Sequence, residues 1–211
     1  IAVITASIGT EYSEIVRDCI ENKREYCARH GYDFICGTQS RDLSRPLAWS
    51  KIKLIQDYLG QYDWIFWSDA DSFIMNLSVP LEAFIDNRAM MVVACDWNGM
   101  NTGQFLLQNC TESFELLHGS YQLTQFIYHP WWEQAAIRQY LFDHRDLLNF
   151  VKIVPQRWIN SYPQEIAGDN LDSIYHPGDF ILHFPGARGL FLKELIHHYK
   201  KLNLIRQFCL E

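Results

Sequence analysis

The sequence predicts an α/β protein with a parallel sheet and crossover helices. Three apolar runs, at residues 1–5, 32–36 and 64–67, alternate with two segments that have the periodicity of amphipathic helices. This strand–helix–strand–helix–strand order is typical of parallel sheets. The chain has 211 residues, of which 48% are hydrophobic and 20% charged. It therefore has enough apolar side chains for the core of one domain, and a disordered chain is excluded.

The elements of the first third follow from apolar spacing and from two glycines. They are a strand at 1–5, a helix from 12 to 30, a strand at 32–36, a helix from 49 to 59 and a strand at 64–67. Gly31 and Gly60 end the two helices. Ligands bind beyond the carboxyl ends of such strands, so we expect Thr5, Ala6 and Ser7 at the ligand edge of the sheet.

The second half has less regular patterns. Strands are predicted at 90–94, 151–154 and 180–183, a short helix at 131–141 and an amphipathic C-terminal helix at 191–202. Asn109 and Glu112 have the spacing of a capping box, which predicts a helix that begins at Asn109. No linker or repeat divides residues 1–211, so we expect a single domain.

The charge balance and the absence of apolar leaders limit the partners and the location. The chain has 18 Lys and Arg against 25 Asp and Glu, a net charge of −7, which argues against nucleic-acid binding. No apolar run reaches about 18 residues, and no signal peptide is visible, so we expect a cytoplasmic, non-secreted protein without a membrane segment. The first residue is Ile1, not Met, which suggests a piece of a longer polypeptide. The six cysteines are expected to be reduced and mostly buried.

The strongest local signal is a pair of carboxylates, Asp69 and Asp71, just after the apolar run 64–67. Two aspartates at a strand end can share one divalent cation, and oxygen ligands favour Mg²⁺ or Mn²⁺ over zinc. A bound diphosphate would fill the open coordination positions. The alternative is a solvated turn, because aspartate is common after strands. The place at the ligand edge of a parallel sheet favours the metal site.

A second signal is the segment His183-Phe-Pro-Gly186-Ala-Arg188, in which a short strand ends at a histidine and a Pro-Gly turn follows. His183 is a candidate third metal ligand, since Mn²⁺ tolerates imidazole. Gly186 would let the backbone approach a phosphate closely, and Arg188 would bind phosphate oxygens in a bidentate manner. The alternative is a partly buried histidine beside a surface turn.

Two weaker signals concern hydrogen bonds and phosphate binding. Asn101-Thr102-Gly103 is interpreted as a small polar turn before an apolar strand, suited to hydrogen bonds with hydroxyl groups. Its alternative is a turn without a ligand. Lys51 lies near the start of a predicted helix and would reach a phosphate, whereas most lysines are simply solvated.

A third weaker signal is Trp131-Trp132-Glu133-Gln134. A carboxylate and an amide beside two indoles make a sugar-binding wall, because the CH faces of sugars stack on aromatic rings. The alternative is a helix N-terminus with buried tryptophans.

Taken together and in order, these motifs resemble glycosyltransferase family 34, which holds fungal α-galactosyltransferases and plant xyloglucan α-1,6-xylosyltransferases. They are also similar to the glycosyltransferase domains encoded by chloroviruses. The resemblance covers residues 1–190 and rests on Trp49-Ser-Lys51, Trp64-Ile-Phe-Trp-Ser68-Asp69-Ala70-Asp71, Asn101-Thr102-Gly103, Trp132-Glu133-Gln134 and Gly178-Asp-Phe-Ile-Leu-His183-Phe-Pro-Gly186.

This resemblance implies a GT-A fold with a mixed central sheet, a nucleotide-binding half at 1–100 and an acceptor half at 101–211. It implies Mn²⁺ or Mg²⁺, a UDP-sugar donor, a glycan acceptor and retention of anomeric configuration. Asp69, Asp71 and His183 would hold the metal. Glu133 and Gln134 would lie beside the reacting sugar as the catalytic pair.

The remaining implied contacts are with the nucleotide and its diphosphate. They come from Thr5, Ala6, Ser7, Lys51, Ser68, Ala70, Asn101, Thr102, Gly103, Gly186 and Arg188. Two features depart from the family. Plant enzymes have Gly-Cys where this chain has Gly186-Ala187, and we expect no counterpart of the Golgi anchor that plant and yeast relatives carry. If the protein is viral, the host cytoplasm is the expected location.

Three other functions compete with a glycosyltransferase. A phosphohydrolase of the haloacid-dehalogenase type also has a strand ending in D-x-D, but it needs Thr or Val where this chain has Phe73. A catalytically inactive carbohydrate-binding domain would explain the 15% aromatic content, although the three apparent metal ligands argue against it. A nucleotidyltransferase would need a Gly-rich, Lys-bearing loop after the first strand, and residues 5–10 contain one glycine and no lysine.

Overall fold

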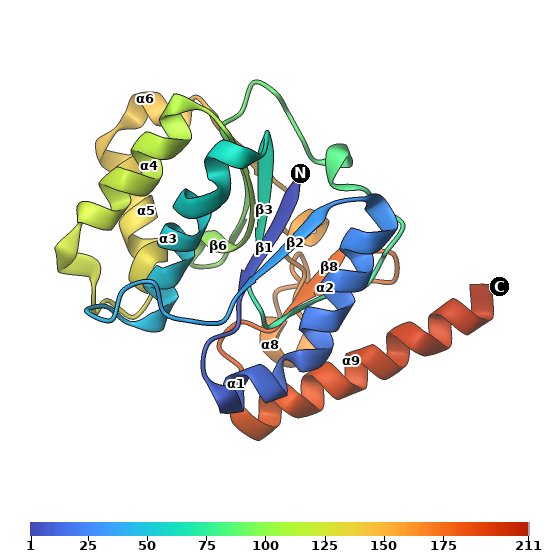
Figure 1. Ribbon diagram of the computed structural model, residues 1–211. Helices are drawn as coiled ribbons and strands as arrows, with labels where there is room; N and C mark the ends of the chain where they lie inside the picture. The colour runs from blue at the N-terminus through green and yellow to red at the C-terminus, as the bar shows by residue number, and fades with distance from the viewer. Residues whose placement is uncertain (211) are drawn as a thin grey trace.

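A computed structural model describes residues 1–210, and side chains through Ile205. A central sheet lies between two layers of helices (Figure 1). The strands are β1 (Ala2–Ala6), β2 (Asp33–Gly37), β3 (Trp64–Ser68), β4 (Ser72–Ile74), β5 (Met91–Asp96), β6 (Gly99–Gln108), β7 (Val151–Val154) and β8 (Ile181–His183). The helices are α1 (Thr10–Ile15), α2 (Arg17–His30), α3 (Ser50–Tyr58), α4 (Thr111–Gln122), α5 (Trp132–Asp143), α6 (Arg145–Leu148), α7 (Gln156–Ile159), α8 (Gln164–Ala167) and α9 (Gly189–Leu210).

The six-stranded sheet has the order β2-β1-β3-β6-β5-β7. The strands β2, β1 and β3 are parallel, which confirms the β-α-β-α-β pattern of the first third. β6 is antiparallel to both β3 and β5, so the whole sheet is mixed. β4 and β8 form a separate antiparallel pair. Over the described residues, we find no helix that combines the length and the apolar character needed to cross a bilayer.

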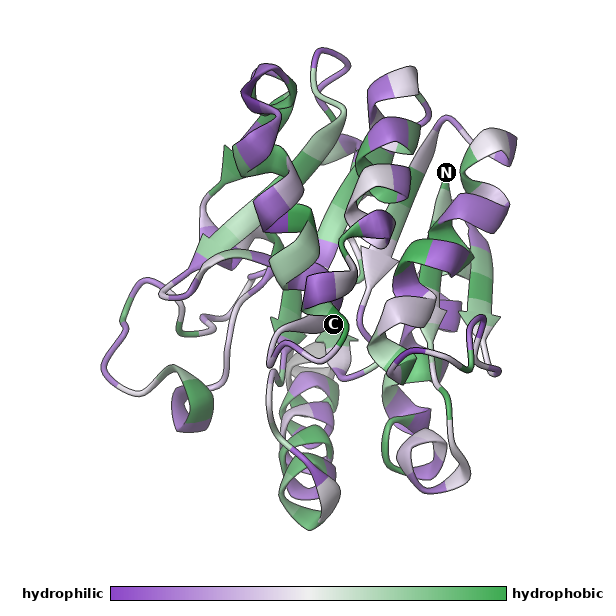
Figure 2. Ribbon diagram, turned by 90° about the vertical axis from the view of Figure 1, so that its left-hand side faces the viewer, coloured by the Kyte–Doolittle hydropathy of each residue, from purple (hydrophilic) through white to green (hydrophobic). Residues whose placement is uncertain are grey.

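Both faces of the sheet are covered, which explains the nearly continuous apolar runs of its strands. In β3, every side chain is buried. Ile65 and Trp67 pack against the layer of α3, α4 and α5, while Trp64 and Phe66 face the opposite layer, where α2 lies. Figure 2 shows the same division, with hydrophobic strands in the middle and polar positions on the outer helices. The buried end of β3 thus holds the residues that follow it in a rigid position.

Two local predictions are wrong. The helix α4 has Cys110, not Asn109, at its N-cap, and no side-chain cap forms. The backbone N–H of Asn109 instead donates to the carbonyl of Asp63. Residues 101–103 are not a turn, because β6 begins at Gly99 and continues through them. An irregularity in the β5–β6 register places Ala94 opposite Asn101 and Val93 opposite Phe105, so the residues between bulge out of the ladder.

The five cysteines in the described part of the chain are free thiols. Cys19 and Cys27 are buried, and burial raises the pKa of both thiols to about 12. Cys36, Cys95 and Cys110 are partly exposed. Cys209 lies outside the described side chains.

Candidate functional site

The two predicted metal-binding aspartates lie in the turn between β3 and β4. The backbone N–H of Asp69 donates to the carbonyl of Gly103 at 2.8 Å, and the indole N–H of Trp67 donates to Oδ1 of Asp69 at 2.7 Å. The hydroxyl of Ser72 donates to the carbonyl of Asp69 at 2.7 Å. These contacts fix the turn, so both carboxylates keep a defined direction at the carboxyl end of β3.

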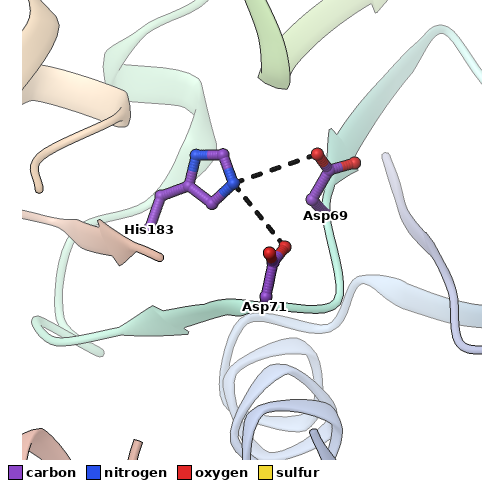
Figure 3. A group of neighbouring side chains, drawn as sticks. All are labelled: Asp69, Asp71 and His183. Atoms are coloured by element: carbon purple, nitrogen blue, oxygen red, sulfur yellow. Dashed lines mark ion pairs between the residues drawn. The ribbon is translucent and has the colours of Figure 1, made fainter. Parts of the chain in front are cut away.

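His183, the last residue of β8, completes the group. β8 pairs with β4, and this register places His183 opposite Ser72. Its Nε2 atom lies 3.6 Å from Oδ1 of Asp71 and 3.9 Å from Oδ2 of Asp69 (Figure 3). Ligand atoms of the three residues all lie within 4.8 Å of one another. These three residues are called the metal group below.

The metal group has the donor set and the tautomer that a divalent cation needs. Nδ1 of His183 lies 2.8 Å from Oδ1 of the buried Asn160, so Nδ1 carries the proton and donates it to this amide oxygen. The lone pair of Nε2 is then directed at the two carboxylates, at distances too long for hydrogen bonds. One imidazole and two carboxylates fit Mn²⁺ or Mg²⁺, and a hydrogen bond to the second ring nitrogen is the usual support of a metal-binding histidine.

Gly103 belongs to the site because it packs against the imidazole ring of His183. A Cβ atom at this position would lie 2.4 Å from Cε1 of His183 and 3.0 Å from its Nδ1. Only a glycine lets the imidazole lie this close to β6. In the prediction, Gly103 contacts the nucleotide, whereas the packing shows a role in placing the imidazole ring.

Lys51 connects the metal group to the predicted catalytic pair. Its ammonium group lies 3.2 Å from Oδ1 of Asp69 and 2.7 Å from Oε1 of Glu133, and it donates to the carbonyl of Thr102 at 2.9 Å. Burial by itself lowers the pKa of Lys51, but Asp69 and Glu133 outweigh burial and raise it above its usual value. All three N–H donors of the ammonium group therefore face oxygen atoms within the protein.

Glu133 and Gln134 begin α5 and lie beside β6. Oε2 of Glu133 is buried without a hydrogen-bond partner, while Oε1 faces Lys51. Oε1 of Gln134 accepts a hydrogen bond from the backbone N–H of Thr102 at 2.9 Å. This contact orients the carboxamide, and its NH₂ group has no partner among the described residues.

The residues predicted at the ends of β1 and β3 lie side by side, because Ile4 pairs with Trp67 in the parallel register. This register continues toward Thr5 and Ser68, both of which are buried. Ser68 shares a hydrogen bond of 2.9 Å with Ser72, and Ala70 packs in the core, so both residues are buried.

The hydroxyl groups of Ser7 and Thr5, at the end of β1, are hydrogen-bonded within the protein or buried. Oγ of Ser7 donates to Oγ of Ser13 at 2.9 Å, and Oγ1 of Thr5 is buried without a partner. Ala6 is the last residue of β1 and pairs with Gly37 of β2. The three residues lie at the carboxyl end of β1, and their contact with a nucleotide stays a prediction.

Asn101 differs from its predicted role. Its Nδ2 donates to Oδ2 of Asp96 at 2.8 Å and to the hydroxyl of Tyr162 at 2.9 Å, and its Oδ1 accepts from the backbone N–H of Gly103 at 2.8 Å. The side chain points into the protein because residue 101 lies in a strand and not in a turn. It holds the bulge that brings Gly103 to His183.

The turn after β8 contains the two remaining predicted contacts. Gly186 has a φ of 77° and is exposed, and Arg188 is exposed two residues later. The turn begins beside the metal group, because the backbone N–H of Phe184 donates to the carbonyl of Asp71 at 2.9 Å. Arg188 has no ion pair with a described residue.

Two residues that the motif analysis did not select lie against the turn between β3 and β4. Lys23 of α2 is fully buried, and its ammonium donates to the carbonyl of Ser72 at 2.5 Å. Burial lowers the pKa of Lys23. Burial and the charges of Asp71 and Asp69 raise the pKa of Tyr12. Asn160, likewise unselected, has no sequence signal, since its partner His183 is 23 residues away.

Known proteins share sequence similarity with most of this chain. The model of the galactosyl transferase GMA12/MNN10 family matches residues 1–92 and 83–189. An alpha-1,2-galactosyltransferase of Schizosaccharomyces pombe is 25% identical over an alignment of 211 residues, which covers 80% of this chain and 55% of that protein. Xyloglucan 6-xylosyltransferase 4 of Arabidopsis thaliana is 27% identical, over 46% of this chain and 21% of the relative. The chain spans about half the length of the fungal relative.

Solved structures show the same fold. A glycosyltransferase involved in the glycosylation of the major capsid of PBCV-1 has a TM-score of 0.73 and 18% identity, over 94% of this chain and all of that one. The galactosyltransferase LgtC, solved in complex with donor and acceptor sugar analogues, has a TM-score of 0.61 and 13% identity, over 96% and 95% of the two chains. The expected GT-A fold is therefore confirmed.

Proposed function

The chain belongs to the galactosyl transferase GMA12/MNN10 family, and from this premise we propose that it is the catalytic domain of a metal-dependent, retaining glycosyltransferase. It transfers a sugar from a UDP-sugar donor to a glycan acceptor. The observation that carries the proposal is the metal group, in which two carboxylates and an imidazole with a defined tautomer converge at the ligand edge of the sheet. Two protein carboxylates and one histidine leave coordination positions open for a diphosphate.

A divalent ion in this group would neutralise the charge that develops on the departing UDP. Lys51 keeps Asp69 in place and adds a fixed positive charge at the site. Arg188, exposed beyond the turn after β8, binds the diphosphate. The carboxamide of Gln134 is oriented by Thr102 and faces the sugar with its NH₂ group.

Retention is proposed to follow a front-face route, in which the acceptor hydroxyl attacks on the side from which the phosphate leaves and a phosphate oxygen takes its proton. Glu133 supports this choice, because one carboxylate oxygen faces an ammonium and the other is buried without solvent contact. A nucleophilic carboxylate needs a free path to the sugar carbon. Glu133→Gln should then lower the rate without abolishing it, and a sugar trapped covalently on Glu133 would contradict the front-face route.

The proposal is tested with a thermal-shift panel of nucleotide-sugars, each measured with and without Mn²⁺. Ligands that bind the folded state raise the melting temperature by mass action. We expect an Mn²⁺-dependent rise with at least one UDP-sugar, and loss of that rise in Asp69→Ala and Asp71→Ala. Asp143→Asn is the matched control, because this exposed carboxylate lies at the far end of α5. No Mn²⁺-dependent rise with any UDP-sugar would refute the proposal.

A further inference from the structure

Two tryptophans that the proposed reaction does not use are exposed beside the site. Trp97 is 53% exposed in the turn between β5 and β6, and Trp131 is 42% exposed just before α5. Trp132, the second member of the predicted sugar-binding wall, instead packs against the core and is only partly exposed. A role of Trp132 in sugar binding stays a prediction. The two exposed residues, Trp97 and Trp131, are called the tryptophan pair below.

Arg138 connects Trp131 to the β5–β6 turn, in which Trp97 lies. Its guanidinium carbon lies 5.4 Å from the centroid of the Trp131 ring, and its Nη1 donates to the carbonyl of Asn98 at 2.7 Å. A Cβ atom on Gly99 would lie 2.9 Å from Nη2 of Arg138, so the glycine allows the guanidinium to lie against the turn. The guanidinium therefore packs between the Trp131 ring and the β5–β6 turn that carries Trp97.

Neighbouring residues hold Trp97 in a fixed orientation. Oδ1 of Asp96 accepts a hydrogen bond from the backbone N–H of Asn98 at 2.7 Å, and its Oδ2 accepts from the hydroxyl of Tyr162 at 2.7 Å. The Trp97 ring packs edge-on against the Tyr162 ring, with centroids 5.4 Å apart. An exposed aromatic ring that is already ordered loses little conformational entropy when a ligand binds to it.

One aromatic ring connects Trp97 to the metal group. The ring of Tyr162 that supports Trp97 also contacts the ring of His183, at a centroid distance of 5.9 Å. On the other side, Trp131 precedes the residues of α5 that contact Lys51 and Thr102. Only the ring of Tyr162 would separate a ligand stacked on Trp97 from His183 of the metal group.

We propose that the tryptophan pair is the acceptor subsite and that it binds a neutral glycan, an inference that rests on the proposed function. The CH faces of sugar rings stack on indoles, while Arg138 and Asn98 supply polar groups at the edge of the surface. Arg138 uses one N–H for the carbonyl of Asn98, and no other hydrogen bond of its side chain is formed with a described residue. The net charge of −7 disfavours a polyanionic acceptor.

The test is a titration with neutral gluco- and manno-oligosaccharides of one to six residues, without donor, followed by tryptophan fluorescence and by saturation-transfer NMR. We expect at least one series to bind and its affinity to increase with length until both indoles are covered. Trp97→Ala and Trp131→Ala should each weaken binding, by roughly 2- to 10-fold from the loss of one aromatic stack. Trp97→Phe should restore part of the affinity, because it keeps an aromatic face.

Trp158→Ala is the matched control, since this tryptophan is 50% exposed on α7 and contacts neither indole of the pair. Equal weakening by the control, or no binding by any oligosaccharide of the panel, would overturn the proposal. So would a dimer in sedimentation experiments that Trp97→Ala and Trp131→Ala dissociate, because the surface would then bind a second copy of this chain.

Failure here is distinguishable from failure of the proposed function. A wild-type protein that shows the Mn²⁺-dependent shift with a UDP-sugar but binds no oligosaccharide contradicts only the acceptor subsite. Oligosaccharide binding without any UDP-sugar shift contradicts the transferase and leaves a carbohydrate-binding surface.

Discussion

Gly103→Ala should damage the metal group although it replaces none of the metal ligands. An added Cβ atom would lie 2.4 Å from Cε1 of His183, whereas ordinary contacts between carbon atoms are about 3.5–4.0 Å. The imidazole would have to retreat by about 1 Å. Metal–ligand distances tolerate changes of only about 0.2 Å, so His183 would no longer lie at bonding distance from an ion shared with Asp69 and Asp71.

Two quantities should change in Gly103→Ala. Overpacking of a buried site typically costs about 1–3 kcal/mol of unfolding free energy, and each kcal/mol lowers the melting temperature of a chain this size by roughly 2–4 °C. Displacement of one ligand should weaken Mn²⁺ binding by about 10- to 100-fold, the range seen when the support of a metal ligand is lost. Both are measured on the same sample, by thermal unfolding and by Mn²⁺ titration in the presence of UDP followed by electron paramagnetic resonance.

Gly119→Ala separates packing from metal binding. Its added Cβ atom would lie 2.0 Å from Cε2 of Tyr140, in the contact between α4 and α5. This control should lose stability and keep the affinity for Mn²⁺. A folded Gly103→Ala protein with the Mn²⁺ affinity of the wild type would refute the reasoning.

Three further changes have defined outcomes. Asn160→Ala removes the acceptor of the imidazole Nδ1–H, so Mn²⁺ affinity should fall by about 10-fold in the titration described above; an unchanged value would contradict the positioning role. Lys51→Met leaves the buried Glu133 carboxylate without its counter-ion, and denaturant unfolding should show a loss of about 3–5 kcal/mol, whereas a loss below 1 kcal/mol would mean that this carboxylate is solvated. Because burial raises the pKa of the Cys19 and Cys27 thiols to about 12, thiol reagents at pH 8 should modify them only after unfolding, and mass spectrometry of the native protein would reveal any earlier labelling.

The parallel part of the sheet could be predicted because its signals are local. The strand that ends at Ser68 is recognised from a run of apolar side chains followed by polar residues. Gly31 ends α2 in the left-handed conformation that glycine favours. The D-x-D pair follows that strand directly, so its place at the ligand edge required no long-range information.

The interpretation of residues 101–103 as a turn was wrong because it, too, used only local signals. A polar Asn-Thr-Gly segment has the composition of a turn, and nothing in the local sequence indicates that Asp96 and Tyr162 satisfy Asn101 inside a strand. Tyr162 is 61 residues from Asn101, and a pattern within one segment carries no record of such a pairing.

The sequence by itself determined the order of the strands and helices in the first third, the acidic pair after β3 and the histidine at the end of β8, because periodicity and residue type are local properties. The tertiary structure alone decided which groups meet. It placed Asn160 on the imidazole, made Lys51 the link between Asp69 and Glu133, and connected Trp131 to the β5–β6 turn through Arg138. These contacts join distant segments, and they form only when the mixed sheet brings β6, β8 and α5 to one edge.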